Sequence, residues 1–97
     1  MSIHVIATVK VLDESCLEPY SEIALPLVEK YGGEYVARTS NPEAVEGSWP
    51  TDRDTVIMRW PSRKVFMTFW DSPEYAVAKE IRRGKVELNN VIIEGES

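Results

Sequence analysis

Hydrophobic and polar residues alternate over residues 3–11, IHVIATVKV, as is typical of a β-strand. Every odd position of this segment is apolar, whereas the even positions mix polar and apolar types: His4, Ile6, Thr8 and Lys10. Successive side chains of a strand point to opposite faces of the sheet, so one face of this strand belongs in a core. The other face is half apolar, which suits a partly polar contact between two subunits that includes bridging water molecules.

Residues 15–31 change to the three- and four-residue spacing of an amphipathic helix, with an apolar stripe formed by Leu17, Tyr20, Ile23, Ala24, Leu27, Val28 and Tyr31. Ser15 and Glu18 have the spacing of a capping box, in which each side chain satisfies an unpaired backbone N–H. Pro26 predicts a kink inside this helix. Gly32-Gly33 predicts its end, because glycine adopts a left-handed cap without steric cost.

The rest of the pattern predicts three more strands and a second helix in two pieces. The strands are expected at residues 34–39, 55–60 and 88–94, and the helical pieces at residues 62–70 and 73–83. The connection SNPEAVEGSWPTD is long enough to hold a further short strand at residues 44–46. The main elements follow the order β-α-β-β-α-β, so the sequence predicts a ferredoxin-like α+β sandwich in one domain over residues 1–97.

The stretch WDSPEYAVAKEIRRG, residues 70–84, combines helix punctuation with aromatic and basic side chains. Ser72 is a predicted N-cap, Pro73 occupies the first helical position, and Glu74 lies near the positive end of the helix dipole. Gly84 supplies the stop. The proline therefore restarts a helix after a bend, and most of the stretch is explained without an anion site.

Composition narrows the possible functions. The chain has 97 residues, one cysteine and a net charge of −5, with its eleven Lys and Arg residues scattered. Nucleic-acid binding is disfavoured, because phosphate contacts require a basic face. Since no apolar run is long enough to span a bilayer and the N-terminus lacks the pattern of a signal peptide, we expect a cytoplasmic protein without a membrane partner.

Four segments resemble a known family: KYGGEYVAR (30–38), VEGSWP (45–50), FWDSPEYAVAKEIR (69–82) and VIIEGES (91–97). They are similar to small bacterial-type proteins of the domain of unknown function 1330 family, over roughly residues 3–95. The resemblance implies the dimeric α/β-barrel superfamily, in which two subunits pack their open sheet faces together. That superfamily includes cofactor-independent monooxygenases, haem enzymes, muconolactone isomerases and proteins without assigned activity, so fold analogy selects no chemistry. Trp60 and Trp70 stand where the family more often has Phe and Tyr, which would alter the shape of a pocket.

The candidate ligand-binding residues are Arg38, Glu46, Trp49, Tyr75 and Arg82, with His4 a weaker candidate. In a functional interpretation, Arg38 is a guanidinium that orients an anion, and Glu46 is a base or hydrogen-bond acceptor. Both positions match the family pattern, which assigns no role to either. They could equally form a structural salt bridge. Tyr75 and Arg82 are seven residues apart and share a helix face, although Arg82 could instead stabilise its helix end. Trp49, Trp60 and Trp70 are suited to lining a cleft, but aromatic residues are more often core or interface anchors.

Other chemistry finds little support in the sequence. His4 is the only histidine, so one subunit cannot assemble a histidine-based metal cluster or a serine–histidine triad, and an exposed or interface histidine is the simpler interpretation. Cys16 is best explained as a partly buried thiol. No cofactor signature is present, neither GxGxxG nor a phosphate loop nor HExxH, so no cofactor or metal is predicted.

Two functional hypotheses remain. The first is a homodimer with one pocket per subunit, between the sheet and the two-piece helix, that acts as a small-molecule binding protein or as a cofactor-independent enzyme. Its ligand would be a small metabolite, anionic or aromatic. The second is a non-catalytic dimeric structural or interaction module whose polar residues are structural. The sequence identifies neither a substrate nor a reaction.

Overall fold

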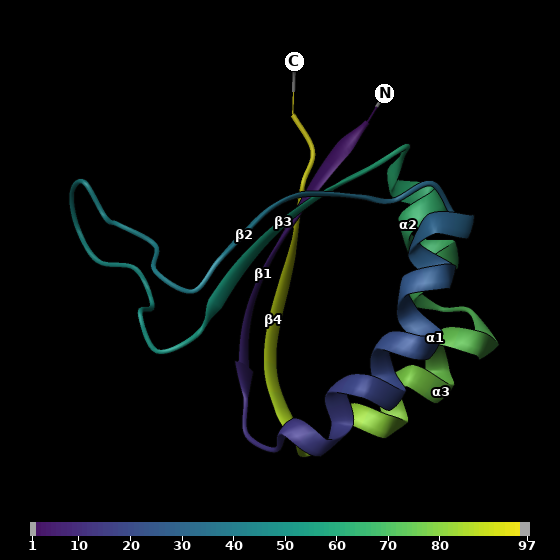
Figure 1. Cartoon of the computed structure of the whole chain (residues 1–97). Coiled ribbons are helices and arrows are strands. Elements are labelled where there is room, and N and C mark those ends of the chain that lie inside the picture. Colours follow the sequence, from purple (N-terminus) through teal and green to yellow (C-terminus); the bar gives the residue numbers. More distant parts are fainter. Residues whose placement is uncertain (1, 96–97) are drawn as a thin grey trace.

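The computed structural model describes residues 2–95, and its elements follow the predicted order (Figure 1). They are β1 (Ile3–Val11), the 3-10 turn η1 (Glu14–Cys16), α1 (Leu17–Lys30), β2 (Glu34–Thr39), β3 (Asp54–Trp60), α2 (Arg63–Trp70), α3 (Pro73–Arg82) and β4 (Val86–Ile93). The four main strands and the two-piece second helix are therefore confirmed. None of the helices described between residues 2 and 95 has the length and apolar character needed to cross a membrane.

The four strands form one antiparallel sheet in the order β2-β3-β1-β4. All three α-helices lie on one side of this sheet, and the other face, called here the open face, is left uncovered (Figure 1). The predicted ferredoxin-like α+β fold is confirmed. The pairing of Val5 with Met58 and with Ile92 places these side chains on the helix-covered face. Ile6 with its partners Ile57 and Val91 lies on the open face.

A β-bulge interrupts the edge strand β2. Tyr35 pairs with Met58, but the next pair along the ladder joins Ala37 to Ile57, so Val36 is the extra residue. A bulge shifts the alternation of side chains by one position. Tyr35 and Arg38, which are three residues apart, therefore face the same side of the sheet.

The segment of residues 40–53, called here the arm, protrudes from the sheet on the side away from the helices (Figure 1). The predicted short strand at residues 44–46 is wrong, because no part of the arm is a strand. A strand needs a neighbour to accept its backbone hydrogen bonds, and the arm leaves the sheet instead of folding along it. Val45, in the middle of the arm, is 99% exposed.

The start of the first helix differs from the prediction. The proposed Ser15–Glu18 capping box is wrong: the side chain of Asp13 accepts a hydrogen bond from the backbone N–H of Ser15 at 2.9 Å. Ser15 lies inside η1, so its own amide needs an acceptor, and an aspartate two residues earlier supplies one. Gly32 ends the helix as predicted, with a positive φ of 80°.

Ser72 joins the two pieces of the second helix in the predicted way. Its Oγ accepts a hydrogen bond from the backbone N–H of Tyr75 at 3.1 Å and donates one to the carbonyl of Phe69 at 2.8 Å. One buried hydroxyl thus caps α3 and holds the end of α2. The bend directs Phe69 and Tyr75 toward each other, with ring centroids 4.4 Å apart.

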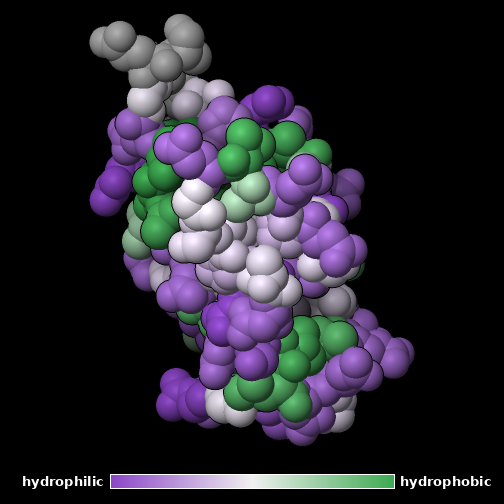
Figure 2. All heavy atoms as spheres, turned by 90° about the vertical axis from the view of Figure 1, so that its left-hand side faces the viewer, coloured by the Kyte–Doolittle hydropathy of each residue, from purple (hydrophilic) through white to green (hydrophobic). Residues whose placement is uncertain are grey.

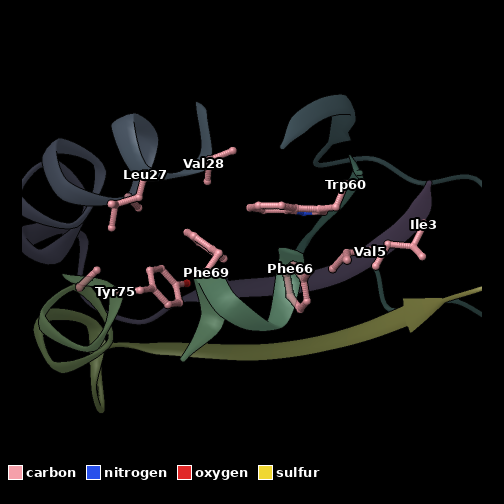
Figure 3. Packing of buried hydrophobic residues seen from close by; sticks show 10 residues of the cluster. Ile3, Val5, Leu27, Val28, Trp60, Phe66, Phe69 and Tyr75 are labelled. Atoms are coloured by element: carbon pink, nitrogen blue, oxygen red, sulfur yellow. The ribbon is translucent and has the colours of Figure 1, made fainter. Parts of the chain in front are cut away.

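The core is centred on Trp60, which is 1% exposed and packs against Phe66 and Phe69 with centroid distances of 5.1 and 4.7 Å (Figure 3). Ile3 and Val5 of β1 and Val28 of α1 belong to the same cluster. Gly33, just after α1, lies directly against the Trp60 ring. A Cβ added at Gly33 would lie only 2.8 Å from that ring, which is closer than packed carbon atoms approach.

We predict that Gly33→Ala destabilises the fold by about 1–3 kcal/mol, because the added methyl group would displace the buried Trp60 ring. Equilibrium urea unfolding followed by tryptophan fluorescence measures this change. Gly95→Ala is the matched control, since a Cβ there meets nothing within 4 Å. Equal unfolding midpoints for the two variants would contradict the packing argument.

Candidate functional site

A cavity of about 610 Å³ lies between the sheet and the helices. All four strands and all three α-helices contribute to its walls, which are mainly apolar: Val5, Ala7, Val9, Val11, Leu17, Leu25, Val28, Val36, Val56, Met58, Val86 and Leu88 are among them. Its volume lies in the usual range for small-molecule sites, and its position is the one predicted for the pocket.

The cavity exists because the core side chains gather at one end of the sheet. Trp60, Phe66 and Phe69 fill the space next to Ile3 and Val5 (Figure 3). Farther along β1, Val9 and Val11 line the cavity together with Cys16 and Leu17 at the beginning of α1. Every residue of β2 is exposed, so the helices leave this edge strand uncovered and the cavity opens past it.

Two phenols meet at the cavity wall. The hydroxyl oxygens of Tyr20 on α1 and Tyr75 on α3 are 2.7 Å apart, a hydrogen bond in which either group can donate. Tyr75 is 3% exposed and packs against Trp70, with ring centroids 5.4 Å apart. Both tyrosines line the cavity, so the hydroxyl pair forms a polar spot in an apolar wall.

The surroundings of Tyr20 favour the protonated form of its hydroxyl. Burial raises the pKa of the Tyr20 hydroxyl, and the adjacent Tyr75 hydroxyl raises it further, while the charge of Arg82 opposes the rise. Tyr35, across the cavity on β2, is half exposed, and the partial desolvation of its hydroxyl also raises its pKa. The hydroxyls of Tyr20 and Tyr35 are therefore neutral hydrogen-bonding groups at neutral pH.

Arg82, in the last turn of α3, also lines the cavity. Its Nε is buried and has no hydrogen-bond partner among the described residues. The guanidinium lies over the Trp70 ring, with Cζ 5.9 Å from the centroid. Lys79 Nζ approaches the same ring at 4.3 Å, but Lys79 does not line the cavity. Arg82 thus occupies the helix end that the sequence predicted and also presents a donor without a partner.

Arg38 lies where the cavity opens past β2. Its Nε and Nη2 donate hydrogen bonds to one oxygen of Asp54, at 3.1 and 2.9 Å. The salt bridge with Glu46 considered from the sequence is therefore replaced by one with Asp54, which begins β3 next to β2. Because the arm turns away from the sheet, Glu46 is exposed.

The structure brings Arg38, Tyr75 and Arg82 together around the cavity, and it places the other candidates elsewhere. Trp49 lies at the base of the arm, where its Nε1 donates a hydrogen bond to Thr55 Oγ1 at 2.9 Å. Thr55 faces the open side of the sheet, opposite the cavity. His4 is exposed on that same open face. Neither Glu46, Trp49 nor His4 is part of the cavity wall.

Sequence reasoning missed Tyr20 and Tyr35 as cavity residues. Tyr20 belongs to an apolar stripe, and such a stripe is the ordinary signal of a core. Tyr35 and Arg38 share a face only because of the bulge at Val36, which alternation alone does not indicate.

Cys16 is a buried thiol, more fully buried than expected, and it too lines the cavity, with Sγ 3.2 Å from the Asp13 carbonyl. Between residues 2 and 95 no group of three or more His, Cys, Asp or Glu side chains could hold a metal ion.

Comparison with known proteins places this geometry in context. A family model described as Domain of unknown function (DUF1330) matches residues 2–96. No curated protein matches the chain. The fold is similar to that of a protein of unknown function from Rhodopseudomonas palustris, with a TM-score of 0.79 at 18% identity, covering 99% of this chain and 83% of that one.

Two further solved structures share the fold at lower similarity. SnoaB, a cofactor-independent oxygenase from Streptomyces nogalater, has a TM-score of 0.66 at 10% identity, covering 99% of this chain and 94% of that one. A dimeric protein of unknown function and ferredoxin-like fold from Bacteroides fragilis has a TM-score of 0.60 at 13% identity, covering 97% and 96%. At these identities the likeness shows the fold alone.

We predict that Tyr20 contributes to a loss of stability at alkaline pH. Its folded-state pKa is raised above the unfolded value of about 10, so its contribution is complete below that pH and decreases as the pH rises above it. Denaturant midpoints measured across this alkaline range should fall less steeply for Tyr20→Phe than for the wild type. Parallel slopes for the two proteins would show that the Tyr20 hydroxyl ionises as freely in the folded state as in the unfolded state.

Proposed function

This chain belongs to the DUF1330 family, and we propose that it is a homodimeric small-molecule binding protein or cofactor-independent enzyme. Its ligand is a small metabolite, anionic or aromatic, held in the cavity between the sheet and the helices. The observation that carries the proposal is the buried Arg82 Nε, which has no protein partner in the described chain and belongs to a residue of the cavity wall.

An unpaired buried donor favours a ligand that accepts a hydrogen bond. Leaving such a group unsatisfied costs on the order of 1–3 kcal/mol, which an acceptor atom on a bound molecule would recover. The guanidinium is also charged at any physiological pH, so an anionic acceptor gains more than a neutral one. Two arginines, Arg38 and Arg82, line the cavity and no carboxylate of residues 2–95 does, although the whole chain has a net charge of −5.

The aromatic part of the proposal rests on the walls. Phe66, Phe69, Trp70 and Tyr75 present ring faces or edges around one end of the cavity. Such a surface favours a flat ring through offset stacking and burial of apolar area. A ligand with an acidic group beside Arg82 and a ring against Trp70 would match both features.

The alternative hypothesis, a non-catalytic module, receives support from one contact. Arg38 is engaged by Asp54, so this arginine is structural at least in part. However, aromatic side chains do not fill the cavity, and Arg82 has no such carboxylate partner in the described chain. These two features favour a binding role, and the catalytic form of the proposal draws on SnoaB, which has this fold.

The homodimer is proposed to form through the open face (Figure 2). Figure 2 shows hydrophobic and hydrophilic side chains mixed on this side of the molecule. Ile6, Ile57 and Val91 form an apolar row across three strands, and Val91 is 51% exposed. The Bacteroides fragilis protein of the same fold is dimeric. Because the net charge is negative, we propose that the dimer has no nucleic-acid partner. The lack of a signal-peptide pattern and of a long apolar run leads us to propose a cytoplasmic location without a membrane partner.

We predict that aromatic carboxylates raise the melting temperature of the wild-type protein and have little effect on Arg82→Gln. A ligand at one hundred times its dissociation constant adds about 2.7 kcal/mol to the stability of the folded state. Lys79→Gln is the matched control, because it removes a cation from the same helix and the same Trp70 ring without changing the cavity wall. The site assignment fails if the two variants respond alike, or if no acid stabilises the wild type.

We also predict that the protein sediments at micromolar concentration with about twice its chain mass of 11.0 kDa. Ile57→Asp should shift the species toward monomer, because it buries a charge at the centre of the proposed interface. Val77→Asp, on the exposed side of α3, should leave the assembly unchanged. A wild-type monomer, or a dimer that survives Ile57→Asp, would exclude an interface on the open face.

A further inference from the structure

We infer that the Tyr20–Tyr75 hydroxyl pair and Arg82 form an oxyanion site, which binds an ionisable phenol or enol on a flat ring in its deprotonated form. This inference rests on the proposed function and deepens it, because it names the ligand group and the protein atoms that hold it. It is carried by three residues of the cavity wall, of which two share one hydrogen bond and the third has a buried Nε without a partner in the described chain.

The first step is a count of protons at the phenol pair. Tyr20 and Tyr75 share one hydrogen bond of 2.7 Å, so one hydroxyl proton lies between the two oxygens. The second hydroxyl proton is free to point toward a third atom, and both side chains line the cavity. Because burial raises the pKa of Tyr20, its hydroxyl keeps its proton at neutral pH and can take part as a donor.

The second donor is the Nε–H of Arg82. It is buried, has no partner among the residues that the structure describes, and its charge reaches the Tyr20 hydroxyl. One O–H and one N–H therefore remain for a ligand at this part of the wall. A single oxygen that accepts both bonds, as a phenolate or enolate oxygen does, would satisfy the two donors together.

The third step concerns the ligand's protonation state. A neutral hydroxyl could accept from the tyrosine pair, but only an oxyanion gains from the guanidinium charge. The apolar walls strengthen this preference, because charges interact more strongly away from water. The other titratable groups of the wall are Cys16 on η1 and Tyr35 and Arg38 on β2. Outside the wall, Lys79 Nζ on α3 lies 5.5 Å from the centroid of the Tyr75 ring. None of these is an acid whose carboxylate would repel an anion.

The fourth step is the shape of the remaining ligand. Trp70 is held in place by Phe66, at a centroid distance of 5.9 Å and an interplanar angle of 30°, and by Arg82 above its ring. A fixed indole next to the oxyanion donors favours a flat ring that carries the oxygen directly. When the ligand binds as the anion, its proton is released to the solvent and no group on the protein changes protonation state.

The test uses 4-nitrophenol, whose phenolate absorbs visible light, with saturating wild-type protein. A pH titration of the absorbance gives the pKa of the bound phenol. We expect this pKa to lie at least one unit below that of the free probe, which corresponds to at least tenfold tighter binding of the phenolate. Binding measured in buffers of different ionisation enthalpy should show a matching release of protons.

Variants assign the effect to the proposed donors. Tyr20→Phe, Tyr75→Phe and Arg82→Gln should each raise the pKa of the bound phenol toward that of the free probe. We expect each variant to lose threefold or more of the preference for the phenolate over the phenol. Tyr35→Phe and Lys79→Gln, which remove a phenol and a cation outside the proposed site, should keep the full shift. If a tyrosine variant fails to fold, the wild-type pKa still decides, because an unchanged or raised value overturns the oxyanion site.

A second probe separates this inference from the proposed function. 4-Nitrobenzoate has the same ring and a two-oxygen anion in place of the phenolate. If 4-nitrobenzoate binds and 4-nitrophenol does not, or if the phenol binds without a lowered pKa, the inference is wrong and the binding cavity remains. If neither probe binds and no acid shifts the melting temperature, both the inference and the proposed function are overturned.

Discussion

The contact between the Trp60 ring and Gly33 is the constraint on which the rest of the structure depends. Trp60 ends β3, Gly33 follows α1, and the ring lies between them and the two phenylalanines of α2. One large side chain thereby ties the sheet to two helices at a single end. The cavity extends from this cluster along β1 to Val9 and Val11. The aromatic cluster that stabilises the fold therefore also forms part of the cavity wall.

The aromatic cluster also connects this core, through packing contacts, to the polar side of the cavity. Phe69 packs against both Trp60 and Tyr75. Ser72 bonds to the end of α2 and the start of α3, and so fixes the bend between these two helices. Tyr75 then meets Tyr20 from α1, and Arg82 follows two turns later on the same helix. The donors are therefore positioned by buried packing, which gives a site that needs little rearrangement to receive a ligand.

Much of this arrangement could be predicted from the sequence, and the exceptions have specific causes. The strands, the ferredoxin-like order and the Ser72 cap follow from short-range periodicity and turn chemistry, which act within a few residues. The start of α1 was misplaced because Asp13 and Ser15 compete for the same role, and only the local backbone decides between them. Glu46 was expected near Arg38, but Asp54 is brought closer by strand pairing. The joint placement of Tyr35 and Arg38 depends on a bulge, which leaves no periodic signal.

The bulge at Val36 has a further consequence for how copies of the chain can associate. A regular, uncovered edge strand is a template on which another strand can add, and repeated addition produces fibrils. In β2 the hydrogen-bonding ladder is broken at one residue, and the charged side chains of Glu34 and Arg38 stand on either side of the break. An incoming strand cannot match this edge along its length. The same irregularity that turns Arg38 toward the cavity therefore protects the protein against open-ended polymerisation.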